Sequence, residues 1–130
     1  MKSGRISAIA VAALFVAARG ALAQDPAAGE QVFQKCRPCH QIGEGARNLV
    51  GPVLNGVVGR PAGSYPGFRY SDANKNSRLV WDAPTLQVYL KNPQAKVPGT
   101  RMAFPGLLSD AEIADLIAYL AQFCADGAKR

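Results

Sequence analysis

The stretch that decides the fold is Cys36-Arg37-Pro38-Cys39-His40, a Cys-x-x-Cys-His motif in a chain of 130 residues. This motif is the attachment signature of c-type haem. Residues three apart lie on one face of a helical turn, so Cys36 and Cys39 can both reach the vinyl groups along one edge of a porphyrin. His40 comes next and is carried beneath the ring, where its Nε2 can meet the iron. The motif therefore predicts one covalently bound haem with His40 as an axial ligand.

Three alternatives to haem could account for the motif. A structural zinc site wants four ligands, and the chain offers no second Cys/His pair. A thioredoxin-like dithiol needs a strand-helix-strand setting, which the sequence pattern lacks. The third is a chance match to a five-residue pattern. An export signal and a long region without helical periodicity both favour haem, because a bound disc would supply the core that the loops cannot.

Residues 1–23 have the features of a secretory signal peptide. A positively charged start precedes the apolar run 6–18, and Ala21-Leu22-Ala23 has the small-x-small pattern of a cleavage site. We expect a mature chain of residues 24–130, exported to an oxidising compartment. Arg19 lies unusually close to the cleavage site, so an uncleaved leader is the alternative.

Composition excludes several classes of protein. The net charge of +6 includes three basic leader residues, so the expected mature chain is only mildly basic. No clustered Lys/Arg stripe is present, which argues against nucleic acid. Outside the leader no apolar run reaches the 18 residues of a membrane span. His40 is the single histidine and the chain has three cysteines, so the sequence excludes a site with two imidazoles and a disulfide framework.

The pattern of the mature chain predicts helices at both ends and loops between them. Asp25-Pro26 begins the first helix, residues 72–76 suit a short helical turn, and residues 84–90 form a helix. The segment 41–66 is rich in glycine and proline and indicates an ordered loop. A capping box at residues 109–112 opens the last helix. Its apolar stripe consists of Ile113, Leu116, Ile117, Leu120 and Cys124, and Gly127 suits its end.

The second axial ligand is argued by elimination. His40 is already used, and Met1 leaves with the leader, so Met102 is the only methionine of the mature chain. A methionine in this position raises the reduction potential and fills the sixth coordination site. The alternatives are that Met102 fills a gap in the core, or that the site is occupied by lysine or left open.

Five further segments, together with CRPCH, make the chain resemble the class I c-type cytochromes, the short mitochondrial type also found in purple bacteria. In order these are NLVGP, GRPAGSYPGFRYSDANKN, YLKNP, PGTRMAF and DLIAYL. The resemblance runs from about Gly29 to Tyr119. It implies an all-α cytochrome c fold, with about three main helices and ordered loops wrapped around one covalently bound haem c.

The resemblance also assigns roles to single residues. The carbonyl of Pro52 would accept a hydrogen bond from the His40 ring. Gly29 and Tyr119 would pack where the first and last helices cross. The residues that would surround the haem propionates are Arg60, Tyr70, Asn74 and Trp81. The residues that would lie near the Met102 sulfur or the haem edge are Tyr89, Thr100 and Phe104. Without the resemblance these side chains would be interpreted as an ordinary turn, core residues and a solvated charge.

The function implied is that of a soluble, periplasmic, monomeric electron carrier without substrate chemistry. By analogy its partners would be a cytochrome bc1 complex, a terminal oxidase, a reaction centre or a periplasmic dehydrogenase. They would dock at the haem edge near a thin ring of basic residues, namely Lys35, Arg37, Lys91, Lys96 and Arg101. The alternatives are a haem enzyme or gas sensor with an open iron, and a dedicated dehydrogenase subunit.

Cys124 departs from the family pattern. It continues the apolar stripe of the last helix, so we expect a buried, inert thiol. An intermolecular disulfide is the alternative.

Overall fold

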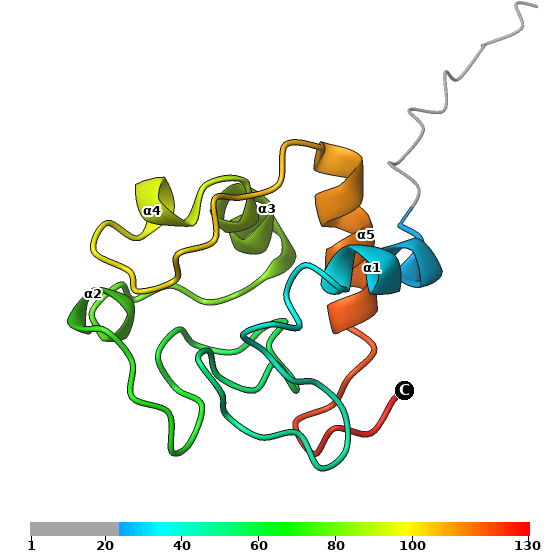
Figure 1. The fold of residues 1–130 in the computed structure, drawn as a ribbon, viewed down its shortest axis with the longest axis horizontal. Helices are drawn as coiled ribbons and strands as arrows, with labels where there is room; N and C mark the ends of the chain where they lie inside the picture. The colour runs from blue at the N-terminus through cyan, green and yellow to red at the C-terminus, as the bar shows by residue number, and fades with distance from the viewer. Residues whose placement is uncertain (1–23) are drawn as a thin grey trace, which may run out of the picture.

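The computed structural model describes residues 24–130, which contain five helices and no β-strand (Figure 1). The predicted signal peptide, residues 1–23, lies outside the described residues. The helices are α1 (Pro26–Phe33), α2 (Asp72–Lys75), α3 (Ala83–Lys91), α4 (Pro93–Lys96) and α5 (Asp110–Leu120). Irregular segments join them. The expected all-α class, with three longer helices and extensive ordered loops, is confirmed.

Each of the three longer helices begins after a capping residue. The starts at Asp25 and Ser109 are those predicted, while the helix predicted from residue 84 begins one residue earlier, after Asp82. The Asp25 side chain accepts a hydrogen bond from Ala27 N at the start of α1, and Asp82 accepts one from Thr85 N at the start of α3. In α5 the Ser109 side chain accepts from Glu112 N. Each cap satisfies a backbone N–H that the first helical turn leaves without a partner.

Helices α1 and α5 cross at Gly29 (Figure 1). A Cβ on Gly29 would overlap the Asp115 carbonyl and lie 2.8 Å from the Cβ of Tyr119. Only glycine therefore allows the two backbones to come this close. One turn further along α1, the fully buried Phe33 stacks on Tyr119 with ring centroids 5.3 Å apart. The contact joins the two ends of the chain, and Gly29 and Tyr119 lie at the crossing as expected.

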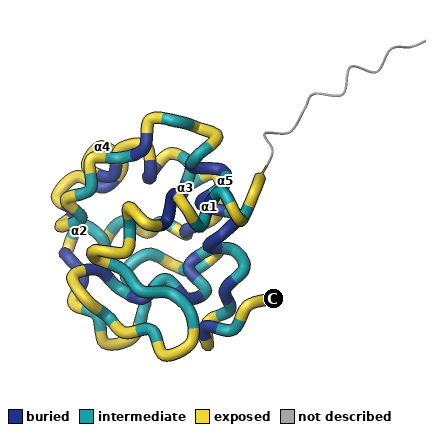
Figure 2. The backbone as a smooth tube through the Cα atoms, turned by 45° about the vertical axis from the view of Figure 1, so that its right-hand side comes forward, coloured by how far each residue is buried: buried dark blue, intermediate teal, exposed yellow. Residues whose placement is uncertain are grey.

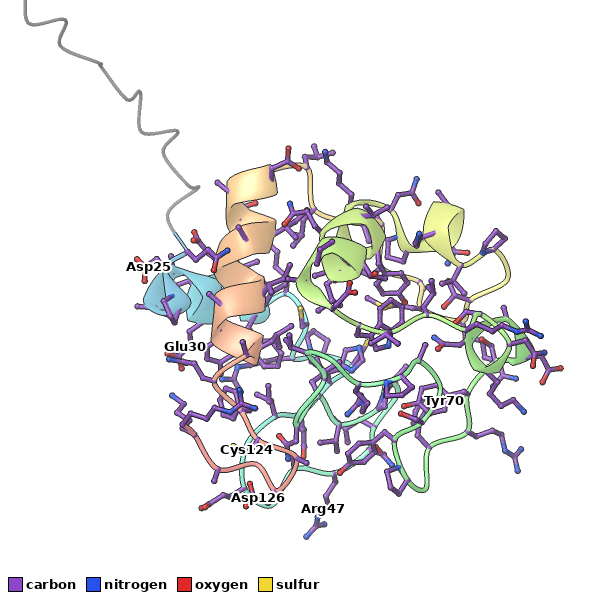
Figure 3. The ribbon with its side chains drawn as sticks, turned by 180° about the vertical axis from the view of Figure 1, so that it is seen from behind. Asp25, Glu30, Arg47, Tyr70, Cys124 and Asp126 are labelled. Carbon is purple, nitrogen blue, oxygen red and sulfur yellow. The ribbon has the colours of Figure 1, made fainter. Side chains whose placement is uncertain are left out.

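The end of α5 differs from the prediction. The helix stops at Leu120 and Ala121 caps it, although the apolar stripe predicted a continuation to Cys124. Residues 122–130 instead fold into a tight hairpin, with an antiparallel bridge between Phe123 and Lys129. Cys124 lies in this hairpin below α5 and is only partly buried (Figure 3). The expectation of a buried thiol on the helix stripe is therefore wrong.

Helix α4 was not predicted from the sequence. The preceding helix was predicted to end at residue 90, and α3 ends at Lys91. The Asn92 side chain then accepts a hydrogen bond from Ala95 N and starts another helix at Pro93. A proline that cannot continue one helix is well placed in the first turn of the next.

Much of the buried surface belongs to the loops rather than to the helices (Figure 2). The segment 41–66 has no helix or strand, as predicted, yet Val53, Asn55 and Val57 are buried within it. Helix α3 packs against both α4 and α5. Within residues 24–130, no helix is long and apolar enough to cross a membrane.

Candidate functional site

The Cys-x-x-Cys-His motif forms a helix-like turn directly after α1. Cys36 N donates to Phe33 O at 2.8 Å, while Cys39 N and His40 N both donate to Cys36 O at 3.1 and 3.0 Å. This spacing of hydrogen bonds is that of one helical turn, so the two thiols and the imidazole follow one another around it. The geometry expected for the motif is therefore present.

The two thiols lie in different surroundings. Cys39 is exposed, whereas Cys36 is partly buried and packs against the hydrophobic core. Burial of the Cys36 side chain, aided by the neighbouring Cys39 and opposed by Lys35, raises the pKa of its thiol to about 11. This thiol is therefore protonated at neutral pH.

A cavity of about 210 Å³ opens beside the motif. Protein interiors are packed as tightly as organic crystals and rarely leave voids larger than a water molecule. The apolar part of the wall comes from the loops and from α3 and α5, and includes Val50, Leu54, Val57, Leu86, Leu90 and Leu120. The fold therefore leaves room for a large apolar group at the place where the motif would attach one.

The His40 side chain enters this cavity with one ring nitrogen already engaged. Its Nδ1 lies 2.7 Å from the Pro52 carbonyl oxygen. A carbonyl can only accept, so Nδ1 carries the proton and Nε2 has a free lone pair. Gly51 lies against the ring, and a Cβ there would come within 2.7 Å of Nδ1. Burial lowers the pKa of His40, which keeps the imidazole neutral and able to bind a metal.

The Met102 side chain reaches the same cavity from the segment after α4. The Tyr89 hydroxyl donates to its Sδ at 3.1 Å. Its backbone is held on both sides, because Met102 N donates to Thr100 Oγ1 at 3.2 Å and Gln94 Nε2 donates to Met102 O at 2.7 Å. A methionine held by three hydrogen bonds is more ordered than one that merely fills a gap in a core.

Gln94 was not singled out from the sequence. It lies on α4, the helix that the sequence pattern did not predict, and its side chain also donates to Thr100 O at 3.4 Å. It joins α4 to the segment that carries Met102. A glutamine on a short unpredicted helix gives no recognisable signal in one sequence, so only the structure could reveal it.

Four of the predicted polar and aromatic residues line the cavity together, namely Arg60, Tyr70, Asn74 and Trp81. Trp81 stacks on Tyr89 with centroids 4.5 Å apart. The Tyr70 hydroxyl accepts from Tyr65 N at 3.0 Å, and Tyr70 lies among the loops on the side of the molecule away from α1 (Figure 3). These four side chains come from one stretch, residues 60–81, and folding brings them to the same cavity as His40 and Met102.

Two buried polar atoms in this group have no partner, Arg60 Nε and Asn74 Oδ1. The other two Arg60 nitrogens donate to the carbonyls of Asn55 and Val53 at 2.9 and 3.2 Å. Buried polar groups in proteins are almost always hydrogen-bonded. The unpaired N–H of a guanidinium beside an apolar cavity fits a ligand that is flat and apolar but bears carboxylates, as haem does.

Two expected residues lie outside the lining of the cavity. Cys36 packs against the core instead, one turn from Cys39. Phe104, expected at the haem edge, is partly buried against the same core.

Comparison with known proteins agrees with this geometry. The sequence model of the family described as "Cytochrome c" matches residues 26–123. The chain belongs to the cytochrome c family. The cytochrome c2 of Rhodoblastus acidophilus is 59% identical over 107 residues, which cover 82% of this chain and all of that one. The cytochrome c2 of Blastochloris viridis is 54% identical over 110 residues, 85% of this chain and 87% of that one.

Solved structures of the family have the same fold. Cytochrome cH from Methylobacterium extorquens superposes with a TM-score of 0.70 at 47% identity, and the match covers 75% of this chain and 97% of that one. Membership in the cytochrome c family gives this chain one covalently attached haem c and the role of an electron carrier. It replaces the zinc and thioredoxin-like interpretations of the motif.

Proposed function

We propose that His40 and Met102 are the two axial ligands of the haem iron, with Cys36 and Cys39 as its thioether attachments. The observation that carries this proposal is that His40 Nε2 and Met102 Sδ belong to side chains lining the same apolar cavity. The Pro52 carbonyl holds His40 with Nε2 free, and Tyr89 holds the thioether. A His/Met pair leaves no open coordination site, so the function is electron transfer without substrate chemistry.

The bound haem c supplies an iron that accepts and releases single electrons. The protein keeps its surroundings rigid and dry, because the wall of the cavity is mostly aliphatic and aromatic. The Pro52 carbonyl makes the imidazole a stronger donor and prevents it from rotating. Arg60, Tyr70, Asn74 and Trp81 form the polar end of the cavity, where the unpaired N–H of Arg60 Nε would donate to a propionate. Each of these groups is in place before an electron arrives, so little has to move.

Electron exchange also needs a surface for partners. We place it beside Met102 and the thioethers, where Arg101 lines the cavity and Arg37 and Lys96 are exposed on the neighbouring segments. The other two basic candidates are partly neutralised, since Lys91 pairs with Asp110 at 2.8 Å and Lys35 lies 3.9 Å from Glu112. This thin positive rim suits brief contacts with an acidic redox protein in the periplasm. The candidates are a bc1 complex, a terminal oxidase, a reaction centre or a periplasmic dehydrogenase.

Replacement of Met102 tests the ligand assignment. Met102→Ala should keep covalent haem but lose the weak long-wavelength band of a thioether bound to ferric iron, bind carbon monoxide when reduced, and show a lower potential. Leu86→Ala, which also removes part of the cavity wall, should keep the band. If Met102→Ala keeps the band and excludes carbon monoxide, another residue is the ligand. A wild type that binds carbon monoxide readily would favour the enzyme or sensor function.

A charge-reversal pair tests the docking surface. Lys96→Glu should slow reduction by an acidic partner and weaken the dependence of the rate on ionic strength. Arg130→Glu makes the same change in charge at the far end of the chain and should have little effect. Equal effects of the two variants would mean that only net charge matters.

A further inference from the structure

The last nine residues form a compact C-terminal hairpin, residues 122–130, that the electron-carrier function does not use. Cys124 N donates to Ala128 O at 2.9 Å, and Arg130 N donates to Gln122 O at 2.8 Å. The side chain of Phe123 is buried, and Lys129 Nζ lies 5.4 Å from the centroid of its ring. The hairpin is therefore an ordered unit anchored in the core.

The His40 loop, residues 39–56, is closed at its neck by backbone and side-chain hydrogen bonds. The four bridging pairs are Cys39 with Gly51, His40 with Pro52, Gln41 with Leu54 and Gly43 with Asn55. Gly43 and Asn55 are joined by two hydrogen bonds, because Asn55 Oδ1 accepts from Gly43 N at 2.7 Å and its Nδ2 donates to Gly43 O at 2.9 Å. The hydrogen bond between His40 and Pro52 is thus one of several that cross the neck of the loop, and the buried Asn55 makes the last of them.

The hairpin packs directly on the closing end of this neck. Gly56 N donates to Phe123 O at 3.2 Å. Gly127 approaches Gly43 so closely that a Cβ on Gly127 would overlap the Gly43 carbonyl and lie 2.8 Å from Glu44 N. Gly127 is also in a left-handed conformation with φ near +90°. Residues of the C-terminal hairpin therefore pack on both sides of the two hydrogen bonds that join Gly43 and Asn55.

We propose that the C-terminal hairpin is a positioning element for the His40 ring, and that Gly127 and Asn55 are its two key residues. The hairpin holds Gly43 against Asn55, which keeps the neck in register and the Pro52 carbonyl within reach of His40 Nδ1. The inference rests on the proposed role of His40 as an iron ligand. A shorter bond from Nδ1 to the carbonyl strengthens the imidazole as a donor and favours ferric iron. Loosening of the hairpin should therefore raise the reduction potential.

Two alanine variants of the haem-loaded protein test this proposal. Gly127→Ala places a methyl group against Gly43, whereas Gly45→Ala meets nothing within 4 Å. Both glycines have positive φ, +90° at Gly127 and +72° at Gly45, so alanine strains the backbone in both variants, and only Gly127→Ala also contacts the neck. We expect Gly127→Ala to raise the potential and to speed exchange of the His40 Nδ1 proton by about tenfold, as local opening controls exchange. Gly45→Ala should change neither.

The proton exchange is read by nuclear magnetic resonance in the reduced protein. Lower stability of Gly127→Ala with unchanged potential and unchanged proton exchange would overturn the proposal, and so would equal shifts in the two variants. If Gly127→Ala yields no holoprotein, the chain ended after Asp126 takes its place, with the same two readouts. Asn55→Ala, which removes both bonds to Gly43, should shift both readouts in the same direction as Gly127→Ala.

The same spectra separate this proposal from the ligand assignment. If His40 binds iron, its ring protons in the wild-type protein are shifted far from their ordinary positions by the haem. Absence of that shift would refute the ligand role of His40 whatever the variants do. Presence of the shift, with no response to Gly127→Ala, would leave the ligand assignment standing and refute the role of the hairpin.

Discussion

The hydroxyl of Tyr89 donates a hydrogen bond to the Sδ of Met102 across 3.1 Å, between α3 and the segment after α4. Tyr89 is 6% exposed and stacks on Trp81, so it has little freedom to turn away. Burial raises the pKa of its phenol, and a hydrogen bond to Thr100 partly opposes that shift. Tyr89 therefore stays protonated and remains a donor to the sulfur.

Tyr89→Phe should lower the reduction potential. A hydrogen bond to the thioether withdraws electron density and so favours ferrous iron; its loss should cost about 1 kcal/mol of that preference. A tenfold change in a one-electron equilibrium is about 1.4 kcal/mol, or roughly 59 mV, so the expected fall in the reduction potential is smaller than that. Spectroelectrochemistry measures the shift. Val88→Ala, an exposed position on the same helix, is the control, and an unchanged potential in Tyr89→Phe would show that the bond does not tune the iron.

Gly29→Ala should destabilise the protein through the crossing of α1 and α5. The new methyl group would overlap the backbone of Asp115, which cannot move without shifting the helix. Overpacking of this kind costs about 1–3 kcal/mol or more. Denaturant unfolding of the haem-loaded protein measures the loss. Ala27→Ser adds one atom on the exposed face of α1 and should have little effect, so comparable losses in the two variants would contradict the packing argument.

Cys124 should be the one thiol of the mature protein that reacts with a thiol reagent. Cys36 and Cys39 are the proposed thioether attachments of the haem, while Cys124 lies partly exposed in the C-terminal hairpin. We expect one equivalent of reagent to react with the native protein and none with Cys124→Ser. Since the side chain is outside the core, the substitution should change stability by less than about 0.5 kcal/mol. No reaction before unfolding would restore the buried-thiol interpretation.

Asp82 should make α3 sensitive to acid. Hydrogen bonds from the side chain of Thr85 and from Thr85 N, the latter at 2.9 Å, hold the pKa of Asp82 below its usual range. Because the pKa is lower in the folded state, the stabilisation is complete above the unfolded value of about 3.9 and is lost as the pH falls through the folded value. Asp82→Asn caps equally well without a charge, so its unfolding midpoint should fall less steeply below pH 4. Parallel acid profiles would argue against this contribution.

Local chemistry accounts for the parts of the fold that could be predicted from the sequence. The helix starts at Asp25 and Ser109 follow from capping, which depends on a few neighbouring residues. The end of α5 could not be predicted in the same way. Cys124 fits the spacing of the apolar stripe, but Phe123 turns the chain back into the core and ends the helix at Leu120. Tertiary packing decided where that pattern stopped.

The sequence alone determined the haem-binding motif, the availability of a single imidazole and of a single methionine outside the predicted leader, and the helical class, since these depend on residue identity and short spacings. Only the tertiary structure decided that His40 and Met102 share one cavity, that Gln94 holds the methionine segment and that the C-terminal hairpin packs on the neck of the His40 loop. The first and the last of these relationships join residues that are dozens of positions apart. They are set by packing and by the need to pair buried polar groups, and neither leaves a periodic signal in one sequence.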